Sequence, residues 1–177
     1  MGRVDPPSQV ASELLDCLVG LLDDEGRPVC RAVLASGGSV PWDVCGESSD
    51  GSEGQAWVAV GQVTPVEQFP AGSPPHRCPP PEYATVLTVA VLRCAATVDD
   101  QGRPPSPERM AADASKVAAD RAAMRDAVVC CLAGGLEPGE WQMGSWTPLG
   151  PQGGCVGGQQ QVTVATRACR CVEVGDG

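Results

Sequence analysis

The most regular pattern of apolar positions in the chain lies in residues 83–132. Residues 83–95 (YATVLTVAVLRCA) carry apolar or β-branched side chains on both faces of an extended chain, which is typical of a strand in the middle of a sheet. After a proline-rich turn, Ser106 and Pro107 suit the N-cap and first position of a helix, and glycines 134 and 135 suit its end. The expected apolar stripe of this helix consists of Met110, Ala114, Val117, Ala118, Met124, Val128 and Cys131. The segment therefore predicts a strand and a helix that pack on each other.

A second amphipathic helix is predicted near the N-terminus, over residues 9–23. Its apolar positions recur with helical spacing and are Val10, Leu14, Cys17, Leu18 and Leu21. Ser8 is the expected N-cap, because its hydroxyl accepts a hydrogen bond from a free N–H of the first turn. Residues 1–7 are then expected to form a flexible N-terminal arm.

Four further apolar runs predict strands over residues 29–35, 56–66, 141–149 and 160–174. In the second run, Gly61 is expected at a bulge or a close crossing and Pro65 at an edge or at the end of pairing. In the last run, one face is expected to carry Val162, Val164, Thr166, Ala168, Arg170 and Val172. The resulting order αβββαββ predicts the α+β class, with a mostly antiparallel sheet of four to five strands and two helices packed on one face. A chain of 177 residues is expected to form one such domain over residues 1–177.

The predicted core joins the central strand to both helices. Its sheet residues are Val86, Leu87, Val89, Val91 and Leu92. Its helix residues are Leu14, Leu18, Val117, Met124 and Val128. Between the elements, long loops are expected over residues 37–54, 69–82 and 150–158. Because loops of that length usually bind something or are disordered, they predict contacts with neighbouring subunits.

Charge and hydropathy exclude several classes of protein. The chain carries 22 acidic and 12 basic residues, a net charge of −10, which argues against a general nucleic-acid binder. It contains no apolar run long enough to span a membrane, and residues 1–10 lack the apolar region of a secretory signal. The absence of Ile and Asn, and a single Lys, indicate a GC-rich coding genome.

Ten cysteines raise the question of a metal site. No C-x2-C pair is present, while Cys130 and Cys131 are adjacent and Cys169 and Cys171 alternate along a strand, so none of these pairs suits a tetrahedral site. The cysteines at apolar positions of predicted elements are expected to act as small hydrophobic residues; they are Cys17, Cys30, Cys94 and Cys131. One or two disulfides are compatible with late oxidation outside the cell, and the sequence leaves their pairing open.

Two other motifs are candidate chemical sites. His76 and Cys78 lie two residues apart in a proline-rich segment, but no third group is placed to orient them, so an exposed loop histidine is expected. The glycine-rich residues 150–158 lack the Gly-Lys-Ser/Thr of a phosphate loop and lead into a strand, which predicts a wide hairpin loop. The sequence therefore predicts that the protein is not an enzyme. It predicts no catalytic, cofactor-binding or metal-binding residue and no cofactor.

The sequence resembles the tail-terminator and other neck proteins of tailed phages that infect actinobacteria. The resemblance rests on the N-terminal amphipathic helix, on YATVLTVAVLRCA followed by a long alanine-rich helix with AAMRDAV, and on the closing segment WTPLGPQGGCVGGQQQVTVATR. It covers most of the chain after Ser8, and the order of elements is its most specific part. A head-closure or other head-to-tail connector ring is the alternative within the same class.

The resemblance implies a structural protein of the virion, located at the head–tail junction and assembled in the host cytoplasm. It implies a homo-oligomeric ring, as a rule a hexamer, that contacts the major tail tube protein and the head-closure or adaptor proteins. Genomic DNA would pass through its lumen without specific binding, and an acidic chain suits that passage. The proline-rich residues 74–81 are expected to lie on a neighbouring subunit. The alternative of another class is a small Cys-rich binding module or metal protein.

Overall fold

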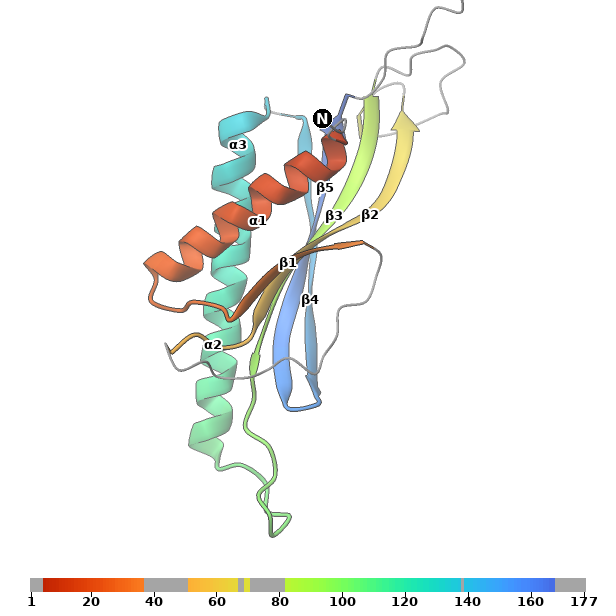
Figure 1. The fold of residues 1–177 in the computed structure, drawn as a ribbon. Coiled ribbons are helices and arrows are strands. Elements are labelled where there is room, and N and C mark those ends of the chain that lie inside the picture. The colour runs from red at the N-terminus through yellow and green to blue at the C-terminus, as the bar shows by residue number, and fades with distance from the viewer. Residues whose placement is uncertain (1–4, 37–50, 67–68, 71–81, 138, 168–177) are drawn as a thin grey trace, which may run out of the picture.

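The computed structural model describes residues 5–36, 51–66, 69–70, 82–137 and 139–167. In order, the elements are α1 (Pro6–Asp24), β1 (Arg31–Ser36), β2 (Gln55–Val66), β3 (Glu82–Cys94), α2 (Pro107–Asp126), the π-helical turn η1 (Ala127–Cys131), α3 (Leu132–Gly135), β4 (Trp141–Gln152) and β5 (Cys155–Thr166). Both long helices cover the same face of one sheet, as Figure 1 shows. The predicted α+β class and the order αβββαββ are confirmed.

The sheet has five strands in the order β1-β2-β3-β5-β4. Only β1 and β2 run parallel, and the other three neighbouring pairs are antiparallel. β3 lies between β2 and β5, so the prediction of a central strand is confirmed. The predicted bulge near Gly61 is also confirmed, because the register of β2 against β3 shifts between Val60 and Val63. Pro65 lies beyond the part of β2 that pairs with β1. On the β1 side it therefore has no neighbouring strand to which an N–H would have to donate.

The start of α1 differs from the prediction. Pro6 and Pro7 form its first positions, and Asp5 is the N-cap, with Oδ2 accepting a hydrogen bond of 3.2 Å from the N–H of Ser8. Prolines are favoured here because the first turn has no use for their missing N–H groups. The assignment of Ser8 as N-cap and of residues 5–7 to a flexible arm was therefore wrong.

The main core fills the space between the sheet and the two long helices. Its buried residues on the sheet side include Val58, Leu87, Val89, Val91, Val162 and Val164, and those on the helix side include Leu14, Leu18, Leu22, Met124 and Val128. Most of the predicted core is confirmed by these contacts. Val86 and Val117 are only half-buried.

A smaller apolar cluster lies on the opposite face of the sheet. It contains Trp57, Ala59, Ala90, Leu92 and Cys155. Leu92 is 1% exposed, as expected for a core residue, but it belongs to this second cluster and does not face the helices. The prediction that Leu92 packs against α1 and α2 was therefore wrong. The reason is the alternation of β3, which sends Val91 and Leu92 to opposite faces.

The apolar stripe predicted for α2 is correct only in its second half. Met124 and Val128 are buried, whereas Met110, Ala114 and Ala118 are exposed. The first half of α2 stands away from the sheet and only the second half packs across β3 and β5 (Figure 1). A straight helix crosses a twisted sheet over a limited length, and the periodicity of its residues does not reveal which turns lie within that length.

The glycine-rich residues 150–158 form a tight hairpin and not the wide loop that was predicted. β4 continues to Gln152, which pairs with Cys155, so only Gly153 and Gly154 remain for the turn. Both glycines have positive φ, 58° and 75°, which matches the two-residue turns that join antiparallel strands. Two positive φ angles in sequence are readily adopted only by residues such as glycine, and this explains the Gly-Gly pair.

Several predictions fall on residues outside the described part of the chain. They concern the proline-rich segment at 74–81, His76 and Cys78, residues 37–50 of the first long loop, and the extension of the last strand beyond Arg167. Among the described residues, none of the helices is both long enough and apolar enough to cross a membrane.

Candidate functional site

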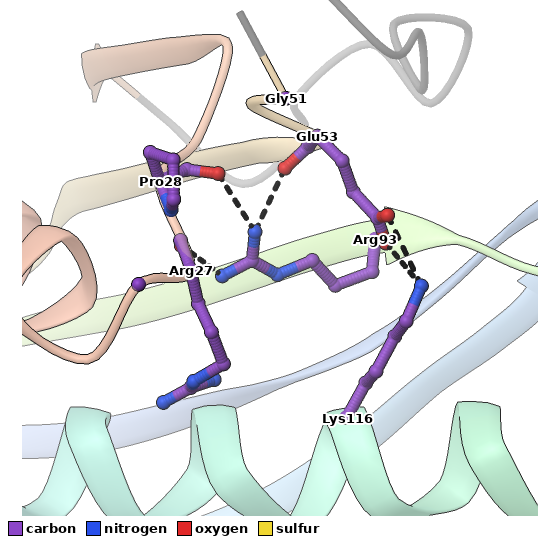
Figure 2. Close-up of a pocket in the computed structure, with 7 residues that line it drawn as sticks. Arg27, Pro28, Gly51, Glu53, Arg93 and Lys116 are labelled. Carbon is purple, nitrogen blue, oxygen red and sulfur yellow. Dashed lines mark hydrogen bonds and ion pairs between the residues drawn. The ribbon is translucent and has the colours of Figure 1, made fainter.

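A recess lined by charged residues lies where α2 passes the end of β3. Its volume is ≈ 180 Å³, and its wall comes from the turn after α1, the segment before β2, β3 and α2. The lining residues are Gly26, Arg27, Pro28, Gly51, Glu53, Arg93 and Lys116 (Figure 2). Because buried charges are rare without partners and cluster at functional sites, this recess is the candidate functional site.

The floor of the recess is the guanidinium of Arg93, which is 3% exposed. Its Nε and Nη2 donate to the two carboxylate oxygens of Asp120, at 2.9 and 3.0 Å. Nη1 donates to the carbonyl oxygens of Pro28 and Glu53, at 3.1 and 2.8 Å, and Nη2 donates also to that of Arg27, at 2.9 Å (Figure 2). These five contacts match the five N–H donors of a guanidinium, so Arg93 is saturated by protein groups alone.

Asp120 is the partner of two arginines. It is 1% exposed, lies on α2, and also accepts a hydrogen bond from Nη1 of Arg27. Arg27 in turn forms an ion pair with Glu25 and donates to the carbonyl oxygen of Ala119 at 3.3 Å. Through these bonds Asp120 ties α2 to β3 and to the turn that follows α1. A buried carboxylate is tolerated here because both of its oxygens are engaged by cations.

The rim of the recess is an ion pair between Lys116 and Glu53. Nζ of Lys116 lies 2.9 and 3.0 Å from the two carboxylate oxygens of Glu53. The same pair borders a second recess of ≈ 260 Å³ along α2, whose lining also includes Cys94, Arg109 and Asp113. The carboxylate of Asp113 accepts the backbone N–H of Ala96 at 2.8 Å, and so holds the chain that leaves β3 against α2.

This arrangement of ion pairs holds segments of the chain together. Three cations, Arg27, Arg93 and Lys116, face three carboxylates, those of Glu25, Glu53 and Asp120. A general base needs a free lone pair within reach of a substrate, and the carboxylate oxygens of Asp120 are both engaged by arginines. Within the described ranges, no group of three or more His, Cys, Asp or Glu residues is arranged to hold a metal ion.

The cysteines play a different part from the one predicted for them. Cys17 of α1 and Cys131 of η1 form a disulfide that joins residues 114 positions apart. Cys30 is exposed, and its thiol lies 3.1 Å from the carbonyl oxygen of Ser52. Cys155 is also disulfide-bonded. The expectation that Cys17, Cys131 and Cys30 act as small hydrophobic residues was wrong, because the first two are bridged and the third is exposed. One or two disulfides were expected, and their pairing, which the sequence left open, depends on which residue faces Cys17 from another helix.

The charged recess was missed by sequence reasoning. The sequence did contain a signal for this ion pair. Arg93 is a charged residue in an otherwise apolar strand, and Asp120 lies seven residues after Asp113, which places both carboxylates on the same face of α2. The sequence could not show that Arg93 and Asp120 are in contact in space, because they are 27 residues apart in the chain. Of the two other candidate motifs, His76 and Cys78 lie outside the described residues, and the Gly153–Gly154 turn belongs to the β4–β5 hairpin.

Comparison of the sequence with known proteins does not identify a family for this chain. A scan against protein-family models finds no match, and a search of curated proteins finds no similar sequence.

Proposed function

We propose that the protein is a structural subunit of the neck of a tailed phage, most simply the tail terminator, which forms a ring that caps the tail tube and joins it to the head. The observation that carries the proposal is the layered fold with the order αβββαββ. This is the order on which the resemblance to neck proteins rests. The partners of such a subunit are further copies of itself, the major tail tube protein and the head-closure or adaptor proteins.

The character of the charged recess supports a structural role. Arg93 and Asp120 lie in the most buried ion pair of the described residues, and their hydrogen bonds are used within the subunit. A rigid joint of this kind fixes the position of α2 relative to the sheet. Rigid subunits suit a closed ring, because small errors in subunit shape add up around the ring and prevent closure.

The charge of the chain agrees with a ring around DNA. A net charge of −10 disfavours adhesion of the phosphate backbone, so a duplex can pass through the lumen without being retained. A basic lumen would bind the duplex and slow its ejection. No enzymatic step and no cofactor enter this proposal.

The proposal is tested by locating the protein in purified virions. Mass spectrometry of the virions should detect it, and electron microscopy with a bound antibody should place the label at the head–tail junction. Phage lacking the gene should accumulate filled heads and separate tails in infected cells. Absence of the protein from purified virions contradicts the proposal.

The length of the separate tails distinguishes the two neck roles. A cap on the tail tube determines where the tube stops growing, so its loss should give tails of uneven length. A head-closure ring acts on the head, so its loss should leave tails of uniform length. Uniform tails in the gene deletion would favour the head-closure alternative.

A further inference from the structure

A small apolar cluster lies on the face of the sheet away from α1 and α2, which is called the outer face here. Its members include Trp57, Ala90, Leu92 and Cys155, which are between 0% and 6% exposed. Within the described ranges, the partly buried apolar residues packed against the cluster all belong to strands of the same sheet; they are Val33, Ala35 and Leu149. Neighbouring strands lie beside these side chains and not on top of them. The low exposure therefore indicates that another part of the chain covers the cluster.

The connection between β1 and β2 is the segment placed to cover this face. β1 and β2 are parallel neighbours, so residues 37–50 have to run back along one face of the sheet before β2 begins. β3 and β4 are also parallel, and the chain between them crosses the helix face as α2. Crossover connections between parallel strands of one sheet are right-handed in about 98% of cases.

The two crossovers have the same hand only if they lie on opposite faces. Both move in the same direction through the strand order β1-β2-β3-β5-β4, but β2 runs antiparallel to β3. Reversing the strand direction while keeping the direction of the step reverses the hand of a crossover on a given face. With α2 on the helix face, a right-handed connection over residues 37–50 lies on the outer face.

The disulfide of Cys155 gives a second and independent indication. Cys155 is 0% exposed and is disulfide-bonded. The other five cysteines of the described chain are accounted for, two by their mutual bond and three as thiols; they are Cys17 and Cys131, and Cys30, Cys94 and Cys130. The partner of Cys155 is therefore one of the four cysteines outside the described ranges, which are Cys45, Cys78, Cys169 and Cys171.

Two of these four cysteines follow the far end of β5. β5 runs from Cys155 to Thr166, so its ends are about 36 Å apart. Cys169 and Cys171 follow Thr166 by three and five residues, which span at most about 18 Å. A disulfide requires Cα atoms about 4.4–6.8 Å apart, so neither of them reaches Cys155.

Cys78 is tied to the same far end of the sheet. Tyr83 of β3 pairs with Thr166, the last residue of β5. Cys78 precedes Tyr83 by five residues, which again span at most about 18 Å. The distance that remains to Cys155 is at least about 18 Å, more than a disulfide spans.

Cys45 is within reach of Cys155. Nη1 of Arg93 donates to the carbonyl oxygen of Glu53 at 2.8 Å, and Arg93 pairs with Val156, the neighbour of Cys155. Glu53 therefore lies at the Cys155 end of the sheet. Cys45 precedes Glu53 by eight residues, which span up to about 28 Å. The chain is long enough to bring Cys45 to Cys155 across the outer face.

We propose that residues 37–50 dock on the outer face of the sheet and that Cys45 is the disulfide partner of Cys155. The segment shields the apolar cluster from solvent, and the bond holds it there. Together with Cys17–Cys131, which lies on the helix side, the bond gives each face of the sheet one covalent tie. The assignment goes beyond the neck role and does not depend on it.

The bond forms by thiol–disulfide exchange with a small-molecule disulfide, which is the oxidant. The thiolate of Cys45 attacks that disulfide, forms a mixed disulfide and releases one small thiol. The thiolate of Cys155 then attacks the sulfur of Cys45 and releases the second small thiol. The two protein thiols thereby lose two protons and two electrons, and the small-molecule disulfide is reduced to two thiols.

Disulfide mapping tests the pairing directly. The purified full chain is folded with oxidised and reduced glutathione, its remaining thiols are alkylated, and it is cleaved after Lys, Arg and Glu without reduction. This cleavage leaves Cys45 in residues 32–47 and Cys155 in residues 141–167, each without a second cysteine. Mass spectrometry should find these two peptides linked. A link from Cys155 to any other cysteine, or an alkylated Cys155, overturns the pairing.

Melting temperatures measure what the bond contributes. Without reductant, Cys45→Ala should melt about 5–10 °C below the wild type, because the chain from Cys45 to Cys155 is no longer closed into a loop. With reductant, the two proteins should melt alike. The matched control Cys130→Ala removes an exposed thiol and should melt like the wild type under both conditions. Equal melting of Cys45→Ala and the wild type without reductant contradicts the bond.

Limited proteolysis tests whether the segment is held on the sheet. In the native, oxidised wild type, a protease that cleaves after Glu should cut at Glu47 several times more slowly than in Cys45→Ala. Glu108, at the exposed start of α2, is the reference and should be cut at the same rate in both proteins. Equal rates at Glu47 exclude a segment held by this bond. The neck role is judged by the presence of the protein in virions, so either idea is able to fail while the other stands.

Discussion

Replacing Asp120 by Asn should be among the most damaging single changes in the charged recess. The carboxylate accepts two hydrogen bonds from Arg93, at 2.9 and 3.0 Å, and is 1% exposed. An asparagine would keep one acceptor but turn its NH2 group toward the donors of a guanidinium. Arg93 would then remain buried with its charge uncompensated, and breaking a buried ion pair in this way costs about 3–5 kcal/mol.

The cost is expected to lie within that range and not above it. The three carbonyl oxygens that accept from Arg93 remain in place, and the side chain of Arg27 is exposed enough for water to replace its bond to Asp120. Urea unfolding, followed by circular dichroism at neutral pH with disulfides intact, measures the free energy of unfolding. A loss of that size should also lower the melting temperature by about 10 °C.

A matched control and a double variant make the test specific. Asp126→Asn removes a carboxylate of the same helix that pairs with its exposed neighbour Arg125, so its effect should be at most about 1 kcal/mol. Arg93→Met combined with Asp120→Asn should cost less than the sum of the two single changes, because no uncompensated charge remains. If Asp120→Asn changes stability by less than about 1 kcal/mol, the recess does not hold these segments together.

Three further changes test other parts of the fold by the same unfolding measurement. Leu92→Ala should cost about 2–5 kcal/mol, since the residue is 1% exposed and its loss leaves a cavity on the side of the sheet away from the helices; an unchanged melting temperature would contradict the placement of β3. Gly158→Ala should cost about 1–3 kcal/mol, because the added Cβ would lie 2.4 Å from the indole of Trp146. The control Gly134→Ala should be neutral or stabilising, because a Cβ at that position has no neighbouring atom within 4 Å. Cys17→Ala should cost about 2–5 kcal/mol by removing a bridge between residues 114 apart, and a cost near zero would exclude that bridge in solution.

Local signals in the sequence were enough to predict the elements and the fold class. Ser106 and Pro107 marked the start of α2, and the alternation over residues 83–95 identified a central strand. These signals are reliable because a cap or an alternating strand depends on residues a few positions apart. The same signals were less reliable at boundaries, as the two prolines before Ser8 and the Gly-Gly turn of the β4–β5 hairpin show.

What only the tertiary structure decided depends on pairs of residues that are distant in the chain. Periodicity assigned an apolar face to α2, but the crossing of the helix over the sheet decided that Met124 is buried and Met110 is exposed. The partners of Arg93 and of Cys17 lie 27 and 114 residues away, and no local pattern encodes such distances. The sequence by itself determined which segments are helices and strands, because that choice follows from neighbouring residues. The charged recess and the disulfide arise only when the folded chain brings those segments together.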